Sequence, residues 1–422
     1  MSAGPLAGRV RALRQDALVR SSALLLLSTV EIAAGGFLFW QISARLFSPA
    51  DIGRTSALIT ASALIANLAL LGMQNSVIRY LREWDDPAGT VNSATTVVAG
   101  AAAGGAWLFV LGAGRLAPEL TMLREPGAAA LFVIFTVALA VSLINDNVFI
   151  GLHRSGLVAG RNTVTVLLRL GWPFAVTGLG AFGLFTAYQG AATVALIAYL
   201  VVQHRRLGVP VRFRVDRARF AAMWRYSAGN YVATVLLLFP ALVMPLVVAH
   251  RLDPEHAAYY YIASLVAGVL TFVPQATSRS LFAQAAADPA RLRPLLRRVV
   301  LLTAAVQVPA LAVLVAAGPV VLRLFGAAYA TAYPLLVVLL VSAALATIGF
   351  LGNALLLIVG RLTVMCLVTA AAAVVSVGGA YLFAGRGLLW VGGSLLAGEI
   401  VLGLAYLPLI ASISRPVDKE TG

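Results

Sequence analysis

Charged and amide side chains interrupt several long apolar stretches of this sequence, and they are its main candidates for chemistry. Glu31 lies near the middle of the first stretch, Asn145 and Asp146 lie toward the end of the fourth, and Arg169 lies in the fifth. A charged group in hydrocarbon costs several kcal/mol unless it is paired or hydrated. Each of these residues therefore marks either an interhelical contact or a polar cavity.

The polar residues of the fifth stretch share one helix face. Asn162, Thr165 and Arg169 are spaced by three and four residues, which places their side chains on the same side of a helix. An ion pair of Arg169 with Asp146 or Glu31 would fix the packing of the helices. The alternative is a polar cavity between two halves of the protein, and the sequence leaves both interpretations open.

Polar residues also end two other apolar stretches. Arg79 follows Gln74-Asn75-Ser76, and Arg279 follows Gln275. Arg79 joins Asp146 and Arg169 as a residue for which a cavity and a packing contact are both plausible. Glu399 lies in the middle of the last stretch and stands alone in its half, which favours a role in packing or gating.

The sequence contains no arrangement of residues that is typical of catalysis or metal binding. Its only lysine is Lys419, so no Gly-x-x-x-x-Gly-Lys phosphate-binding loop occurs. None of the four histidines belongs to a His-Glu-x-x-His pattern, and the single cysteine, Cys366, fits a small core residue. We therefore expect a protein that is not an enzyme and that uses neither a cofactor nor a metal.

Twelve apolar stretches position these residues. Hydrophobic residues make up 61% of the 422 and charged residues 11%, against about 25% charged residues in soluble domains. Each stretch is long enough for the ~20 residues that a helix needs to cross a bilayer. The chain is predicted to be an all-α polytopic integral membrane protein with about 12 transmembrane helices in two six-helix lobes. The stretches cover residues 22–46, 55–80, 91–114, 127–150, 160–180, 182–203, 226–249, 257–284, 296–317, 331–358, 362–384 and 388–412.

The basic residues are distributed unequally between the two sides of the membrane. With the N-terminus inside, 23 of the 31 Lys and Arg residues fall in cytoplasmic segments and seven in external ones. The positive-inside rule then places both termini in the cytoplasm and the protein in the cytoplasmic (inner) membrane. This topology, together with contact to anionic lipids, accounts for the net charge of +15. We expect no nucleic-acid partner.

The second six stretches repeat features of the first six at an offset of about 205 residues. The turn at residues 44–51 is answered by the turn at 249–255. Matched halves with a site between them are typical of transporters. The predicted parts are a cytoplasmic amphipathic segment, a first lobe, a basic cytoplasmic linker, a second lobe and a cytoplasmic tail, at residues 1–21, 22–204, 205–225, 226–412 and 413–422 respectively.

Helix breakers fall at equivalent depth in the leading stretch of each half. The first stretch carries Gly35 and Gly36, and the seventh carries Pro240, at an offset of 205 from Gly35, with Pro245 a turn later. Proline removes a backbone donor and clashes with the preceding turn, and Gly offers no side chain to hold a fixed packing. These four residues are therefore candidates for hinges that switch access.

Three segments near the N-terminus form a recognisable pattern. They are an aromatic-rich first helix that ends in Ala-Arg-x-x-Ser-Pro-x-Asp-x-Gly at residues 44–53, the pair Leu71-Gly72, and Ile78-Arg79-Tyr80-Leu81. Over about the first 85 residues this pattern resembles bacterial polysaccharide-biosynthesis flippases of the multidrug/oligosaccharidyl-lipid/polysaccharide exporter superfamily. The rest of the chain agrees with that family in the number of spans and the loop lengths.

The resemblance implies a function and a set of partners. Two six-helix lobes would alternate between inward and outward openings and move a polyprenyl-diphosphate-linked oligosaccharide to the outer leaflet. The product would feed a cell-surface polysaccharide such as lipopolysaccharide or exopolysaccharide. The implied partners are this lipid-linked oligosaccharide, membrane lipids, and glycan polymerases or glycosyltransferases.

The resemblance also implies roles for six polar residues. Three cationic side chains would meet the diphosphate, each through two parallel hydrogen bonds: Arg79, Arg169 and Arg279. Two carboxylates and an amide would bind sugar hydroxyls or a coupling ion: Glu31, Asp146 and Asn145.

Three other functions compete with this one. A cation-coupled multidrug or small-molecule antiporter of the same superfamily would use Glu31 as its protonation or sodium site. A major-facilitator sugar transporter is disfavoured because residues 81–89 lack that family's Gly-x-x-x-Asp-Arg-x-Gly-Arg-Arg pattern. A membrane glycan polymerase or ligase is disfavoured because no loop is large enough to carry its catalytic carboxylates.

Overall fold

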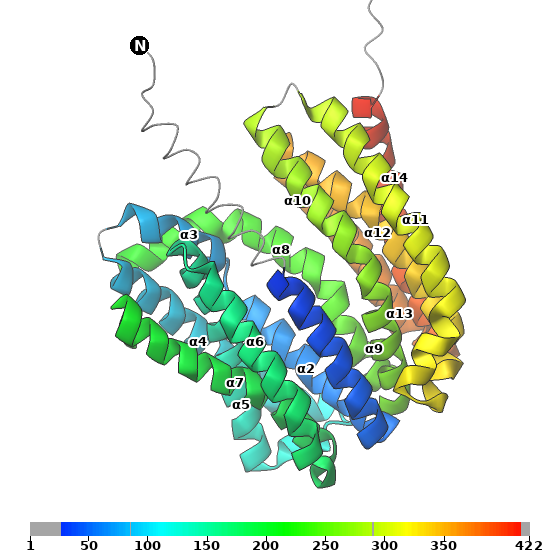
Figure 1. The fold of residues 1–422 in the computed structure, drawn as a ribbon, viewed down its shortest axis with the longest axis horizontal. Coiled ribbons are helices and arrows are strands. Elements are labelled where there is room, and N and C mark those ends of the chain that lie inside the picture. The colour runs from blue at the N-terminus through cyan, green and yellow to red at the C-terminus, as the bar shows by residue number, and fades with distance from the viewer. Residues whose placement is uncertain (1–26, 85, 289–290, 415–422) are drawn as a thin grey trace, which may run out of the picture. The chain divides into compact units, whose positions relative to one another are not determined.

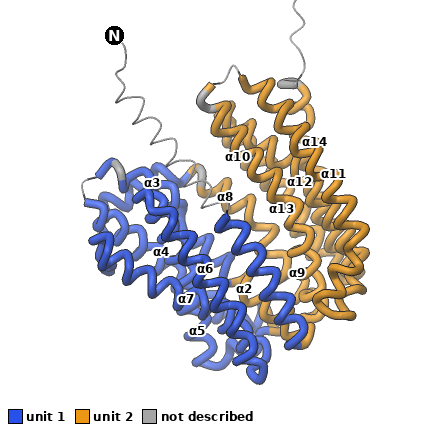
Figure 2. Tube along the Cα trace, in the orientation of Figure 1, with its two compact units in different colours: residues 1–47, 62–116, 120–228 blue, residues 48–61, 117–119, 229–422 orange. Residues whose placement is uncertain are grey.

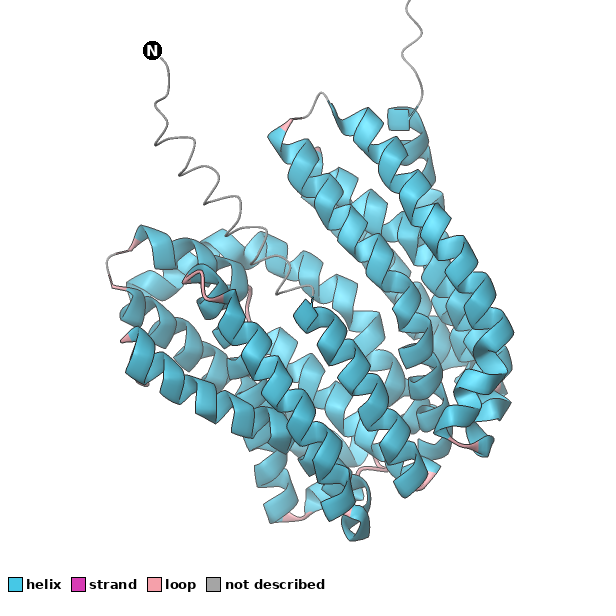
Figure 3. Ribbon diagram, viewed as in Figure 1, coloured by secondary structure: helices cyan, strands magenta, loops and turns pink. Residues whose placement is uncertain are grey.

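The computed structural model describes residues 27–84, 86–288 and 291–414, and over these residues the chain is helical and contains no β-strand (Figures 1 and 3). A first helix covers residues 27–46. The later α-helices, in chain order, are α2 (Pro49–Ala69), α3 (Met73–Glu83), α4 (Pro87–Leu116), α5 (Pro126–Gly151), α6 (Ser155–Gly171), α7 (Gly180–Leu207), α8 (Arg217–Arg251), α9 (Pro254–Gly268), α10 (Phe272–Ala287), α11 (Leu292–Phe325), α12 (Tyr333–Ile358), α13 (Leu362–Phe383) and α14 (Leu388–Ser414).

Ten segments of the described chain are long and apolar enough to cross a membrane, judged by length and composition. They correspond to ten of the twelve predicted spans. The first predicted span begins outside the described residues, and the fifth corresponds to α6, whose 17 residues fall just short of the usual ~20. The prediction of an all-α polytopic membrane protein is confirmed.

The second and eighth predicted spans each depart from a regular α-helix in the structure, to different degrees. The predicted continuous stretch 55–80 is two helices, α2 and α3, because Leu71 and Gly72 adopt left-handed conformations with φ of 48° and 75°. The stretch 257–284 is α9 and α10, separated by a single 3₁₀ turn at Val269–Thr271. The second span is therefore broken, whereas the eighth remains one membrane-length segment, Pro254–Ala285, whose helix tightens for a single turn.

The chain forms two compact units (Figure 2). Within the described residues, the first unit comprises 27–47, 62–116 and 120–228, and the second comprises 48–61, 117–119 and 229–414. The predicted linker, residues 205–225, belongs entirely to the first unit. In the second unit the start of α2 approaches the start of α9 so closely that a Cβ on Gly53 would lie 1.6 Å from the Pro254 carbonyl oxygen.

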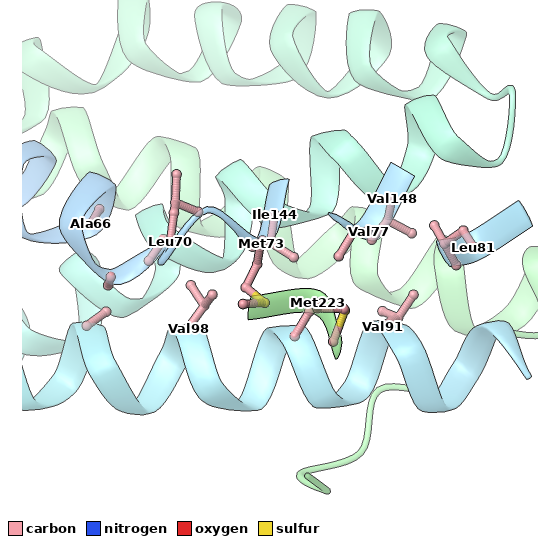
Figure 4. Packing of buried hydrophobic residues seen from close by; sticks show 14 of the residues in the cluster. Ala66, Leu70, Met73, Val77, Leu81, Val91, Val98, Ile144, Val148 and Met223 are labelled. Atoms are coloured by element: carbon pink, nitrogen blue, oxygen red, sulfur yellow. The ribbon is translucent and has the colours of Figure 1, made fainter. Parts of the chain in front are cut away.

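The core of the first unit is an apolar cluster that α3, α4, α5 and the first turns of α8 share (Figure 4). Met73, Val77, Ile144 and Met223 are completely buried there. Helices in lipid associate through close packing and dispersion rather than through exclusion of water. The presence of Met223 in this cluster fixes the beginning of α8 to the first unit.

The core of the second unit depends on small residues that let helices approach closely. A Cβ on Gly352 of α12 would lie 2.1 Å from the Tyr406 ring of α14, and one on Gly398 of α14 would lie 1.9 Å from Ser376 Oγ of α13. The Tyr406 hydroxyl donates to Asn353 Oδ1 at 2.8 Å, so this buried polar group is satisfied within the bundle.

Candidate functional site

A buried ion pair joins α5 to α6 in the first unit. Arg161 Nη2 lies 2.8 Å from Asp146 Oδ2, and the exposed fractions of the two side chains are 9% and 23%. The same guanidinium donates to the Ser142 carbonyl oxygen at 3.0 Å, to Ser142 Oγ at 2.5 Å and to Asn162 Oδ1 at 3.1 Å. Asp146 Oδ1 is buried and has no hydrogen-bond partner among the described residues. The suggested pairing of Asp146 with Arg169 is wrong, because Arg161 occupies that carboxylate.

The position of Arg161 explains why the sequence did not reveal this pair. Arg161 lies at the very start of the predicted stretch 160–180 and was counted with the cytoplasmic basic residues, but α6 begins at Ser155, so Arg161 lies in the second turn of a helix. Asp146 lies five residues before the end of α5 and Arg161 six residues after the start of α6. At 1.5 Å per residue these are depths of about 8 and 9 Å, so the two side chains meet at one level. Equal spacing from the α5–α6 turn is the signal that could have identified the partner.

One hydrogen bond extends this polar network to the first helix, and a separate one beside it joins α5 to α7. Asn162 Nδ2 donates to Ser28 Oγ of the first helix at 2.6 Å, and Asn145 Nδ2 donates to Gln203 Oε1 of α7. Glu31 lies one turn after Ser28, on the same face of the first helix. It is half-buried and forms no hydrogen bond or ion pair with the described residues. These contacts thus bring together Asp146, Asn145 and the helix that carries Glu31.

Arg169 lies about 12 Å from Arg161 along α6, at 1.5 Å per residue. Its guanidinium carbon is 3.6 Å from the centroid of the Tyr188 ring, and its Nε donates to the Tyr188 carbonyl oxygen at 3.1 Å. Tyr188 in turn packs edge-on against the buried ring of Phe39, with centroids 5.1 Å apart. Arg169 is half-buried and has no carboxylate partner among the described residues. Within the described residues, its contacts are therefore with an aromatic ring and a carbonyl oxygen rather than with an acidic group.

The other two predicted arginines lie in different surroundings. Arg79, near the end of α3, forms an ion pair with Glu83 at 2.8 Å and lies 4.6 Å from the Tyr226 ring centroid, with 46% of its side chain exposed. Arg279 on α10 belongs to the second unit, is exposed, and forms no ion pair with the described residues. Substrate binding by either arginine stays a prediction.

The four hinge candidates differ in what surrounds them. A Cβ on Gly35 would lie 2.5 Å from a methyl carbon of Val166 on α6, whereas one on Gly36 would meet nothing within 4 Å. Gly35 is therefore a close-packing position between the first helix and α6. Pro240 and Pro245 lie inside α8, which continues through both. Hinge motion at these residues stays a prediction.

Ten helical segments of the described residues that are long and apolar enough to cross a membrane define the chain as a multi-pass membrane protein. Residues 42–334, more than half of the chain, match the family described as polysaccharide biosynthesis protein, and the chain belongs to that family. The resemblance seen in the first 85 residues is confirmed.

Solved structures show the same fold. "Lipid II flippase MurJ, inward closed conformation" aligns with a TM-score of 0.73 at 11% identity, over 94% of this chain and 90% of that one. An inward-facing multidrug-resistance MATE transporter of the MOP superfamily gives 0.62 at 16%, over 95% and 99%. A MOP-superfamily transporter from Pyrococcus furiosus, described as having a binding pocket of reverse polarity, gives 0.63 at 14%, over 95% and 96%. No curated protein matches the chain. The predicted two-lobed fold of this superfamily is confirmed.

Proposed function

We propose that this protein is a flippase that moves a polyprenyl-diphosphate-linked oligosaccharide across the cytoplasmic membrane by alternating access. Membership of the polysaccharide-biosynthesis family and the flippase-like fold support this function. The single observation that carries it is Arg169, a half-buried cation with no carboxylate partner among the described residues. The protein itself would catalyse no covalent step.

The chemistry of the proposed cargo matches Arg169 better than it matches the other candidates. A diphosphate accepts two parallel hydrogen bonds from one guanidinium, and such a contact strengthens where water is scarce. The Tyr188 ring holds the guanidinium through a cation–π contact at 3.6 Å, and no carboxylate of the described residues pairs with it. Asp146 already binds Arg161 and Arg79 already binds Glu83, so both would have to exchange partners before they met a substrate.

Transport by purified protein tests the proposal. Proteoliposomes would carry a fluorescent polyprenyl-diphosphate oligosaccharide, and dithionite would bleach the molecules that reach the outer leaflet. Arg169→Ala should slow transfer by at least about tenfold, the loss of one well-placed charged hydrogen bond, and Arg169→Lys should restore it only partly because an ammonium cannot form the bidentate contact. Tyr188→Phe, which keeps the ring and the carbonyl, is the matched control and should transport normally.

Two results would reject parts of this proposal. If stably folded Arg169→Ala transferred the glycan lipid at the wild-type rate, the diphosphate would have to bind at other residues. No transfer of the glycan lipid by the wild-type protein, with or without a proton or sodium gradient, would reject the flippase function itself.

Glu31 favours a second candidate, a cation-coupled multidrug or small-molecule antiporter. A carboxylate on the first membrane helix that has no partner among the described residues could bind a proton or sodium ion. In that case Glu31→Gln should abolish gradient-driven efflux of a cationic dye. Glycan-lipid transfer that is unaffected by Glu31→Gln and by either gradient would count against coupling through this residue.

Several finer features belong to the same proposal. We infer an inner-membrane location with both termini in the cytoplasm, because the basic residues concentrate on that side. Glycan polymerases or glycosyltransferases would be functional partners, since a flipped glycan lipid must be made on one side and consumed on the other. Cross-linking in cells that express the complete glycan pathway would test for them.

A further inference from the structure

The segment that precedes α8 lies along α4 and is hydrogen-bonded to it. The backbone N–H of Arg212 donates to Asn92 Oδ1 at 2.8 Å, and that of Asp216 donates to Ser93 Oγ at 3.0 Å. Between them, the Arg214 N–H donates to Thr96 Oγ1 at 3.2 Å. Residues 209–216, called the strap below, are thus fixed to the first turns of a membrane helix.

The contacts with α4 place the strap near one boundary of the hydrocarbon core. The 30 residues of α4 extend about 45 Å, close to the ~40–45 Å of a bilayer with its headgroup layers. A hydrocarbon core of about 30 Å leaves roughly 7 Å of headgroup layer at each end. Asn92 and Thr96 lie about 8 and 14 Å from the start of α4. The strap therefore meets α4 at Asn92 where phosphate groups meet acyl chains, and at Thr96 about 6 Å deeper.

The strap also lies on the side of α4 that turns toward lipid. Thr96 begins a row at spacings of four residues that continues through Gly100, Gly104 and Leu108, and Leu111 follows three residues later on the same face. Gly100 and Gly104 have exposed backbones, and Leu108 and Leu111 are among the exposed large apolar side chains. An apolar exposed face on a membrane-length helix is the face that contacts acyl chains, and the strap caps its end.

The outward side chains of the strap are an apolar residue, Phe213, and the two arginines on either side of it. The Arg214 N–H also donates to the Arg212 carbonyl oxygen at 2.9 Å, which makes a tight turn with Phe213 at its apex. Phe213 is 87% exposed, the largest fraction for any large apolar side chain of the described chain. Arg212 and Arg214 on either side of it are exposed and form no ion pair with the described residues. The one acidic residue of the strap, Asp216, is held by Arg219 at 3.2 Å.

We propose that the strap is a binding site for anionic phospholipid. Phe213 inserts between the upper acyl chains, and the guanidinium groups of Arg212 and Arg214 bind the phosphates around it. The depth set by α4, the apolar apex and two cations that pair with no described acidic residue together select a negatively charged headgroup over a zwitterionic one. This site is separate from the transported glycan lipid, and it would anchor the beginning of α8 to the leaflet as well as to the protein.

Fluorescence quenching at position 213 tests the site directly. The full-length protein with Cys366→Ser and Phe213→Cys would carry an apolar bimane label and be reconstituted in phosphatidylcholine vesicles. Part of the lipid would be doxyl-labelled, as phosphatidylglycerol in one sample and as phosphatidylcholine in the other. We expect doxyl phosphatidylglycerol to quench much more strongly at equal mole fraction, and aqueous iodide to quench little.

Charge variants then identify the groups responsible. Arg212→Ala/Arg214→Ala should lower the preference for phosphatidylglycerol by roughly 30-fold, taking about 1 kcal/mol for each basic residue near an anionic surface. Arg212→Lys/Arg214→Lys should keep most of the preference. The matched control is Arg297→Ala/Arg298→Ala on α11, where two exposed arginines of the second unit are removed, and it should change nothing.

Three outcomes would overturn the proposal. Strong iodide quenching with weak lipid quenching would place Phe213 in water or against a protein. Equal quenching by the two doxyl lipids would mean membrane contact without an anion site. Equal loss of preference in the two alanine pairs would show a diffuse electrostatic attraction rather than a site at the strap.

Discussion

Breaking the Arg161–Asp146 ion pair separates a packing role from a transport role for the buried charges of the first unit. The charged atoms are 2.8 Å apart, which corresponds to an attraction of roughly 6 kcal/mol at an effective dielectric constant of about 20. Desolvation of both groups offsets much of that attraction. Removal of one partner, however, leaves the other charge buried and costs about 3–5 kcal/mol. Arg161→Met and Asp146→Leu should each lower the free energy of unfolding by that amount.

The double variant should lose much less than the sum of the single losses, because two apolar side chains replace the pair without leaving a buried charge. Unfolding in detergent–SDS mixtures, followed by tryptophan fluorescence, measures all four proteins. The matched control is Arg79→Met, which breaks an ion pair with the same 2.8 Å separation but with 46% of each side chain exposed. Because solvent already screens that pair, the free energy of unfolding should hardly change.

The result that would refute this reasoning is a double variant whose loss equals the sum of the two single losses. A loss in Arg79→Met as large as those at the buried pair would refute it as well. Transport then assigns the role. If the double variant regains both stability and export, Arg161 and Asp146 serve packing. If it regains stability but not export, one of the two residues lies on the substrate path.

Three further perturbations test the packing, the electrostatics and the topology of the chain. Gly35→Ala should lower the Tm of the purified protein, because the added Cβ would lie 2.5 Å from a methyl carbon of Val166. Gly36→Ala should leave the Tm unchanged, because its Cβ would meet nothing within 4 Å. Equal shifts in Tm would contradict the packing role of Gly35. The pKa of Asp86 lies below its ordinary value, because the Gly89 N–H donates to its carboxylate and because of the Arg219 charge. The ionised Asp86 carboxylate therefore stabilises the fold above its ordinary pKa, and this stabilisation is lost as the pH falls through the lowered pKa. The difference in Tm between wild type and Asp86→Asn should accordingly shrink between about pH 7 and about pH 3. A difference in Tm that stays constant over this range would exclude the linkage. In a cysteine-free background, a thiol at Ser48 should react with an impermeant maleimide on intact cells and a thiol at Arg206 only after permeabilisation; the opposite pattern would reject the topology.

The helices could be predicted from the sequence because length and apolar content decide whether a segment crosses a membrane. The break between α2 and α3 could not be predicted in the same way. Hydropathy runs on through Leu70 and Leu71, whereas the left-handed conformation of Leu71 and Gly72 depends on the packing around the turn. A Gly in an apolar stretch is too common to mark such a break by itself.

The candidate site could be predicted by residue type but not by partner. Asp146 can be identified from the sequence as a costly buried charge, but its partner cannot, because Arg161 lies at the edge of the predicted stretch 160–180 and counts there as a cytoplasmic residue. The α5–α6 connection is only three residues long, Leu152 to Arg154, so residues about seven positions on either side of it face each other. The strap was missed for a different reason. Hydrogen bonds from its backbone to side chains of α4 leave no trace in charge or hydropathy.

The two arginines of α6 show how one residue type can serve packing in one place and binding in another. Arg161 has a carboxylate, a hydroxyl and a carbonyl around it, so its charge is compensated in the state that the structure describes. Arg169 has one aromatic ring and one carbonyl, and nothing of opposite charge among the described residues neutralises it. A half-buried charge that the described residues leave uncompensated is costly at membrane depth, and an anionic cargo that arrives and leaves is one way to offset that cost. The contrast within a single helix is therefore the reason to look for the diphosphate at Arg169 rather than at the more elaborate network around Asp146.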